Sequence, residues 1–279
     1  MGVKVQDMLG KVEITDQEFQ QIVDFIKRHY GVNLEKKRTL IVGRMSNMLV
    51  KKGYSGYGEY MNQVLKNPFG EEATELVNTL TTNHTFFLRE AQHFDFLREV
   101  VLPELKIKEA KSRDLGIWSA AASSGEEAYT IAMVIRDFFG MDAKNWDTTI
   151  LATDVSRKAL AKAELAVFDA EQIAGLPAVW EKQYFTKRED GSFSLKKDIK
   201  EQVLFRYFNL MEEFPFKKKF HIVFLRNVMI YFDHETKVRL LNKMYDAMAP
   251  GGYLFIGTTE TIDRSQSKFQ YIQPSVYRK

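Results

Sequence analysis

The sequence predicts an α/β protein in which a doubly wound sheet follows a small all-helical domain. Apolar residues recur at helical spacing between residues 14 and 80, whereas strand-like and helix-like segments alternate from about Lys111 onward. One strand-like segment runs into a turn of small residues and then into a helix, as in open α/β sheets. With 279 residues, of which 45% are hydrophobic, the chain can form one large domain or two smaller ones.

The first 80 residues divide into four predicted helices. Thr15 or Asp16 can cap the first helix, which ends near Gly31. Its apolar residues share one face: Phe19, Ile22, Val23 and Ile26. The other helices are expected at residues 34–52, 57–65 and 71–80. We therefore expect a helical domain at 1–80, followed by a linker and helix at 81–110.

The alternating part is expected to form one domain at 111–279. Strands are predicted at 115–119, 149–153, 203–209, 222–225 and 253–257, with helices at 126–139, 156–166 and 234–248. The stretch Ala249-Pro250-Gly251-Gly252 is expected to stop the last helix. Residues 269–272 and 276–277 predict an antiparallel edge on this sheet.

An insertion interrupts the alternation at about 168–206. Its first part, residues 171–183, has the pattern of a helix. Residues 184–197 carry Asp190-Gly191 between strand-like flanks, which predicts a β-ribbon riding on the main sheet. Such a ribbon could steer a partner or simply cover an edge.

Composition excludes several classes of protein. The absence of cysteine excludes disulfides, thiolate metal ligands and a cysteine nucleophile. No apolar run approaches the ~20 residues that span a bilayer, and residues 1–11 lack the apolar core of a signal peptide, so we expect a cytoplasmic location. The net charge of +3 is uneven, because residues 1–66 contain eleven Lys and Arg against seven Asp and Glu. That excess predicts a basic surface that faces nucleic acid, an acidic protein or only solvent.

The turn at residues 117–127 has the shape of a nucleotide site but an unusual charge. A helix N-terminus binds phosphate when it is left open, and here Glu126 and Glu127 occupy the first turn. Two carboxylates repel a pyrophosphate and suit a ligand with a cationic end, such as the ammonium and sulfonium of S-adenosylmethionine. The alanines at 120–122 let a flat ligand approach the backbone. The alternative is an ordinary turn capped by a serine.

Polar residues follow the predicted strands at the edge where open α/β sheets bind ligands. Asp154 can accept both hydroxyls of a ribose, or it can cap the next helix. Asn209 and Leu210 can offer an amide and an apolar edge to an adenine. Arg226 and Asn227 would be buried polar groups that need partners, and a ligand is one candidate.

Residues 81–90 mix hydrogen-bonding side chains, two Phe and an Arg at a domain junction, where pockets often form. The alternative is a capped helix start with Phe86 and Phe87 in the core and Arg89 paired with a surface acid. His84 and His93 lie nine positions apart without matching carboxylates, so no metal site is expected.

Five motifs occur in order along the chain: Asn83-x-Thr85-x-Phe87-x-Arg89-Glu90, Trp118-Ser-Ala-Ala-Ala-Ser-Ser-Gly125-Glu126-Glu127, Ala152-Thr-Asp154, Asn209-Leu210 and Arg226-Asn227-Val-Met-Ile-Tyr231-Phe-Asp233. Together they resemble the CheR family of chemotaxis receptor methyltransferases over nearly the whole chain. The resemblance implies a Rossmann-like class I methyltransferase sheet. It also implies transfer of a methyl group from S-adenosylmethionine to glutamate side chains on chemoreceptor cytoplasmic helices, which yields glutamyl methyl esters and S-adenosylhomocysteine.

The resemblance also implies roles for residues. Arg89 and Tyr231 would act at the reacting end, and the segment at 81–110 would contribute to the cofactor site. The positions at or near the cofactor would be Asn83, Thr85, Arg89, Ala121, Glu126, Asp154, Asn209, Leu210, Arg226 and Asn227. The basic second helix would meet an acidic receptor bundle through Lys36, Lys37, Arg38, Arg44 and Lys51. The resemblance places the enzyme in the cytoplasm at membrane receptor arrays, without nucleic acid or membrane insertion. Members that bind a receptor-tail tether peptide have a longer, glycine-richer ribbon loop than the one around Gly191, which disfavours tether binding here.

A glutamate acceptor makes chemical sense. Its ordinary pKa of about 4.3 leaves it ionised near neutral pH, so it needs no general base. Arg89 could anchor one carboxylate oxygen, and Tyr231 could donate a hydrogen bond or wall the sulfonium with its ring. Two alternatives remain open: a methyltransferase for another acceptor, which would favour a general base, and a non-catalytic sensor that binds the cofactor.

Overall fold

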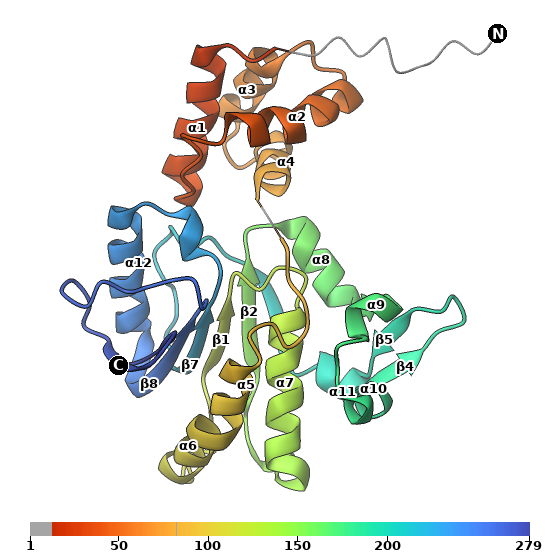
Figure 1. Ribbon diagram of the computed structural model, residues 1–279, viewed down its shortest axis with the longest axis vertical. Coiled ribbons are helices and arrows are strands. Elements are labelled where there is room, and N and C mark those ends of the chain that lie inside the picture. The colour runs from red at the N-terminus through yellow and green to blue at the C-terminus, as the bar shows by residue number, and fades with distance from the viewer. Residues whose placement is uncertain (1–12, 82) are drawn as a thin grey trace. The chain divides into compact units, whose positions relative to one another are not determined.

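A computed structural model describes residues 13–81 and 83–279 (Figure 1). The chain divides into two compact units, Met1–Thr82 and Asn83–Lys279. The first twelve residues of the expected helical domain lie outside the described part. Within the described ranges, no helix is long and apolar enough to cross a membrane.

The first unit consists of four helices in the described part: α1 (Asp16–Tyr30), α2 (Arg38–Lys52), α3 (Tyr57–Lys66) and α4 (Glu71–Leu80). Thr15 begins α1 with a reciprocal capping box to Glu18, and Gly31 ends it in the left-handed conformation. The second helix begins at Arg38 and not at residue 34 as expected. The Asn33 side chain accepts a hydrogen bond from the Glu35 amide (3.0 Å), which holds these residues in a turn.

The second unit contains a seven-stranded sheet with the order β6-β2-β1-β7-β8-β10-β9. Its strands are β1 (Ile117–Ala120), β2 (Ile150–Asp154), β6 (Val203–Tyr207), β7 (Phe220–Leu225), β8 (Met248–Ile256), β9 (Gln270–Gln273) and β10 (Val276–Arg278). The pairs from β6 to β8 are parallel, whereas β10 runs antiparallel to both of its neighbours. This confirms the predicted doubly wound sheet with an antiparallel edge. The strand order reverses between β1 and β7, which is where such sheets bind ligands.

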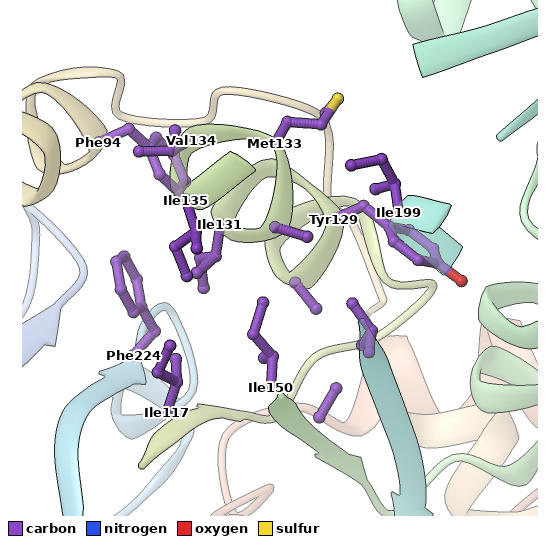
Figure 2. Close-up of a cluster of buried hydrophobic side chains, with 14 of the residues drawn as sticks. Phe94, Ile117, Tyr129, Ile131, Met133, Val134, Ile135, Ile150, Ile199 and Phe224 are labelled. Carbon is purple, nitrogen blue, oxygen red and sulfur yellow. The ribbon is translucent and has the colours of Figure 1, made fainter. Parts of the chain in front are cut away.

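Two hydrophobic layers enclose strand β1. On one face, Ile131 and Ile135 of α7 (Glu126–Phe139) point toward Ile117, Ile150 and Phe224, all at most 1% exposed (Figure 2). On the other face the Trp118 ring packs in an aromatic cluster with Phe208, Phe214, Phe216 and Phe220. Because neighbouring strand residues point to opposite faces, one short strand anchors both layers.

The remaining helices of this unit are α5 (Gln92–Phe96), a π-helical turn (Leu97–Val101), α6 (Leu102–Lys108), a 3-10 turn (Gly140–Asn145), α8 (Arg157–Leu165) and α12 (His234–Ala247). The expected break after the last helix is wrong in detail. Helix α12 ends at Ala247, and strand β8 begins at Met248, so Pro250 and the glycines after it lie inside the strand. The pairing of β7 with β8 shifts register between Phe220 and Ile222, and such an irregularity accommodates a proline.

The insertion forms its own three-stranded sheet, ordered β3-β5-β4. Its elements are β3 (Val167–Phe168), α9 (Ala170–Ile173), α10 (Ala178–Tyr184), β4 (Phe185–Lys187), β5 (Phe193–Leu195) and α11 (Lys197–Lys200). The single helix expected at 171–183 is two short helices, because Pro177 disfavours helical backbone just before it. The insertion is anchored on α7, where Asp137 accepts hydrogen bonds from Trp180 Nε1 (2.6 Å) and from the Tyr184 hydroxyl.

Candidate active site

The connection from β1 to α7 is a tight turn with three left-handed residues. Ala121, Ser123 and Gly125 have φ angles of 66°, 51° and 93°. A side chain at Gly125 would place its Cβ 2.9 Å from the Ala163 Cβ and 3.0 Å from Phe205, so only glycine fits there. The turn therefore lies close against α8 and β6, and the Ala122 amide joins it to β2 by donating to the Thr153 carbonyl (2.8 Å).

Asp154 joins the loops that follow β1 and β2. It is 7% exposed, and its two carboxylate oxygens accept hydrogen bonds from the amides of Ser123 and Ser156, both at 2.8 Å. Burial raises the pKa of Asp154, and these amide hydrogen bonds oppose that shift. The alternative role as helix cap is wrong, because Ser156 caps α8 by accepting from the Ala159 amide (3.1 Å). An ionised carboxylate has about four acceptor positions, so Asp154 keeps acceptor capacity for a ribose beside these amides.

The segment before α5 contacts the same loops. The Asn83 side-chain amide donates to Ser156 Oγ (3.4 Å), and Ser123 Oγ donates to the Asn83 carbonyl (3.1 Å). The alternative of a helix start with both Phe in the core is wrong, because Phe87 is 6% exposed but Phe86 is 47% exposed. Thr85 and Arg89 are half-buried. Arg89 donates to the His84 carbonyl (2.8 Å) and lies over the Phe86 ring; within the described ranges no acid pairs with it.

Arg226 forms the centre of a buried ion-pair network. Its side chain is 1% exposed, and its Nη1 lies 3.0 Å from Glu127 Oε2 while its Nη2 lies 3.2 Å from Glu90 Oε2. Nη2 also donates to the Arg89 carbonyl. Ser119 Oγ donates to Glu127 Oε1 (2.7 Å). Burial raises the pKa of Glu127, and the Arg226 charge counteracts that rise. Glu127 therefore has a charged partner of its own at the start of α7.

Glu126 and Glu127, the first two residues of α7, have different partners. Glu126 is 1% exposed and accepts from Ser124 Oγ (2.8 Å), while Gln172 Nε2 of the insertion lies 3.4 Å from its other oxygen. Burial raises the pKa of Glu126. Glu126 is thus a buried carboxylate whose hydrogen-bond donors are uncharged, whereas Glu127 has a guanidinium partner. A cationic ligand would satisfy Glu126 better than its present neighbours do.

Glu260 supports the segment that follows β7. Its carboxylate accepts from the amides of Asn227 (2.9 Å), Ile230 (3.1 Å) and Gly257 (2.7 Å). Burial raises the pKa of Glu260 against these hydrogen bonds. The 3-10 turn Met229–Tyr231 is thereby fixed to the end of β8, and the half-buried Tyr231 is its last residue. In the sequence, the only signal for Glu260 is its place soon after a predicted strand.

The expected adenine pair is buried: Asn209 Oδ1 accepts from the Met211 amide (3.0 Å), and the Leu210 carbonyl accepts from Lys243 Nζ (2.8 Å). These contacts hold the loop after β6 against α12.

The five basic residues expected to bind substrate have different surroundings. Arg38 donates to Asp16 (2.6 Å) and to the Ile14 carbonyl (2.7 Å), and Arg44 donates to the last carbonyls of α4. These two arginines therefore stabilise the helical unit. The other three, Lys36, Lys37 and Lys51, are exposed.

The site suits a ligand with a ribose at one end and a cationic group at the other. Buried carboxylates lie at the end of β2 and at the start of α7, where a phosphate ligand would be repelled. Among the residues that the structure describes, no group of three His, Cys, Asp or Glu could hold a metal ion. A doubly wound sheet with these groups at its switch point fits the class of S-adenosylmethionine-dependent methyltransferases.

Comparison with known proteins gives the family. The family model for the CheR methyltransferase SAM-binding domain matches residues 83–278, and the model for the CheR methyltransferase all-alpha domain matches residues 17–81. The chain belongs to the CheR methyltransferase family, and it is an S-adenosylmethionine-dependent methyltransferase of chemotaxis.

Two curated proteins illustrate the similarity. A chemotaxis protein methyltransferase of Borreliella burgdorferi is 40% identical over 272 residues, which cover 96% of each chain. Chemotaxis protein methyltransferase Cher2 of Pseudomonas putida is 33% identical, with 92% of this chain and 95% of that protein covered. Among solved structures, the glycopeptide N-methyltransferase MtfA complexed with S-adenosyl-L-homocysteine has a TM-score of 0.34 and 15% identity over 67% of this chain and 60% of that chain. That structural likeness is too weak to bear on function.

Proposed function

We propose that this methyltransferase modifies glutamate side chains on the cytoplasmic helices of chemoreceptors and forms methyl esters. The observation that supports the proposal is the set of hydrogen-bond partners of the Arg89 guanidinium. Within the described residues, its guanidinium bonds only to a backbone carbonyl, while the neighbouring Glu90 pairs with Arg226. Arg89 is thus a half-buried cation with donors left for an acceptor carboxylate.

We propose the following cofactor contacts. Asp154 accepts from the ribose hydroxyls, Asn209 and Leu210 hold the adenine, and Glu126 faces the cationic methionine end. Bound S-adenosylmethionine supplies a methyl group activated by its sulfonium. The remaining positions assigned to this site are Asn83, Thr85, Ala121, Arg226 and Asn227.

In the proposed reaction, the main task of the protein is to orient the acceptor carboxylate toward the methyl group. An acceptor glutamate is ionised near neutral pH, so the site needs no general base. Arg89 would orient the acceptor through one oxygen and leave the other free, since a tight two-point grip would stabilise the ground state. Tyr231, at the end of the turn fixed by Glu260, would donate a hydrogen bond or present its ring to the cationic centre.

We further propose that the exposed Lys36, Lys37 and Lys51, together with Arg38 and Arg44, attract the acidic receptor bundle. Opposite charges raise the rate of encounter and orient the partners. The enzyme would then work in the cytoplasm at membrane receptor arrays. We assign no tether-peptide site to the ribbon, whose β4–β5 turn contains the single glycine Gly191. Neither nucleic acid nor membrane insertion enters the proposal.

A labelling experiment tests the acceptor. The protein is incubated with methyl-labelled S-adenosylmethionine and a receptor cytoplasmic fragment, and the label released by mild alkali is measured. We expect alkali-labile label in the fragment, and far less of it with Asp154→Asn when the cofactor is kept near the wild-type Kd, because this variant is the weak-binding control. Label that survives alkali would indicate another acceptor, and tight cofactor binding without any transfer would indicate a sensor.

A further inference from the structure

The carboxylate of Glu90, the residue after Arg89, contacts several groups from other parts of the chain. Its side chain is 14% exposed. One oxygen accepts from Asn227 Nδ2 (3.2 Å), and the other faces Arg226 Nη2 (3.2 Å) and the Thr258 amide (3.1 Å). The second oxygen also lies 3.5 Å from Nδ1 of His93, whose side chain is 1% exposed. One carboxylate thus contacts the segment after β7 and the end of β8 at the same time.

Glu260 completes this arrangement from the other side. Its carboxylate accepts hydrogen bonds from the amides of Asn227, Ile230 and Gly257. The segment after β7 is therefore held by the carboxylates of both Glu90 and Glu260. We call Glu90 with its three partners Arg226, Asn227 and Thr258 the Glu90 brace. The brace ties the segment that carries Arg89 to the segment that carries Tyr231.

The backbone around the brace adopts conformations that need support. Leu88, Glu90 and Asn227 are left-handed, with φ angles of 55°, 59° and 56°. This conformation is unfavourable for residues other than glycine, so it persists where surrounding contacts determine it. Arg89 lies between two of these residues, and its carbonyl accepts from Arg226. The direction of the Arg89 side chain therefore depends on the same contacts.

We propose that Glu90 is a positioning residue for methyl transfer, whose brace fixes Arg89 and Tyr231 in one shared geometry. The inference rests on the proposed function of those two residues. Glu90 itself does not act as a base. Burial alone would raise its pKa, but the Arg226 charge and the hydrogen bonds outweigh burial and lower it. A carboxylate so engaged is a poor proton acceptor, and a glutamate substrate needs none.

Two substitutions separate geometry from charge. Glu90→Gln keeps the length of the side chain. Its oxygen can still accept from Thr258 and Arg226, and its amide group can donate to Asn227 Oδ1 once the Asn227 side-chain amide flips. Glu90→Asp keeps the charge but is one methylene shorter, so it cannot reach both sides of the brace. If geometry matters, the Asp variant is the slower enzyme; if charge matters, the Gln variant is slower.

The test is steady-state methyl transfer to a receptor fragment, with the affinity for S-adenosylhomocysteine measured by calorimetry. We expect Glu90→Asp to lower kcat about a hundredfold, as a misplacement near 1 Å does, and to weaken cofactor affinity much less, because Asp154 and Glu126 lie outside the brace. Glu90→Gln should stay within about fivefold in kcat. Glu99→Asp and Glu99→Gln are matched controls on a nearby exposed glutamate that pairs with Arg98, and both should match wild type.

Two further readouts identify the mechanism. If Glu90 acts through Tyr231, the double variant Glu90→Asp, Tyr231→Phe should be no slower than the slower single variant, because contacts within one unit are not additive. Amide exchange at 83–91 and 226–232 should accelerate in Glu90→Asp and not in Glu90→Gln. Any of three results would overturn the proposal: a lower kcat for Glu90→Gln than for Glu90→Asp, kcat losses that multiply in the double variant, or unchanged amide exchange in Glu90→Asp. Failure of wild type to methylate the fragment would instead refute the proposed function, and amide exchange would still report on the brace.

Discussion

Replacing Asp154 by Asn separates the structural role of this carboxylate from its role in binding. Asp154 now accepts two backbone hydrogen bonds, from Ser123 and Ser156, at 2.8 Å each. The Asn side chain has one acceptor oxygen, so its amide group must face one of those two N–H groups. An unpaired buried donor costs about 1–3 kcal/mol. We therefore expect the free energy of unfolding to fall by about 2 kcal/mol, as measured by urea denaturation.

Cofactor affinity should fall further than stability alone explains. A hydrogen bond to a charged acceptor contributes about 1.5–3 kcal/mol, and Asp154 would accept from both ribose hydroxyls. Losing the charge should raise the Kd for S-adenosylhomocysteine about a hundredfold at 1.4 kcal/mol per tenfold. Calorimetry on folded variant measures this directly. Asp147→Asn is the control, because Asp147 precedes the same strand at its other end and is 55% exposed. A Kd for Asp154→Asn within threefold of wild type would refute the ribose assignment.

Three other variants test separate parts of the structure. Gly125→Ala should lower both the Tm and cofactor affinity, because φ is 93° and the new Cβ would lie 2.9 Å from a neighbouring side chain; an unchanged Tm would contradict this. Lys36→Glu with Lys51→Glu should raise the KM for receptor and leave S-adenosylhomocysteine binding intact, whereas Lys144→Glu in the other unit should change neither. Burial lowers the pKa of His93 to about 4, below its ordinary 6.5. Between these pH values the unfolded chain binds more protons than the folded one. The contribution of His93 to the free energy of unfolding is therefore fully present above pH 6.5 and is lost toward pH 4, by at most about 3 kcal/mol. His93→Gln should flatten the pH dependence of urea unfolding between pH 5 and 7, and an unaltered slope would count against it.

The sequence predicted those features that depend on local periodicity. Helix α7 occupies residues 126–139 as expected, because its apolar spacing and the glycines at both ends are local signals. The sheet followed from the alternation of strands and helices, since parallel neighbours need helical crossovers. Local patterns failed where a long-range contact decides: α12 ends at Ala247 because Met248 already pairs with Phe220 of β7.

For the candidate site, the sequence predicted polar residues at the carboxyl ends of the strands but not their partners. Asp154 was located because a residue at a strand end occupies that edge in any open α/β sheet. The roles of Glu90, Glu127 and Glu260 could not be predicted in the same way. Arg226 meets Glu127 across 99 positions of chain, and Asn227 meets Glu90 across 137.

The sequence by itself thus determined the family and the fold class, because motifs and periodicity are properties of neighbouring positions. Only the tertiary structure decided which acids remain available to a ligand. Glu126 and Glu127 are adjacent and chemically identical, yet successive residues of a helix point about 100° apart. Glu127 therefore pairs with the Arg226 guanidinium, whereas Glu126 stays a buried carboxylate whose hydrogen-bond donors are uncharged.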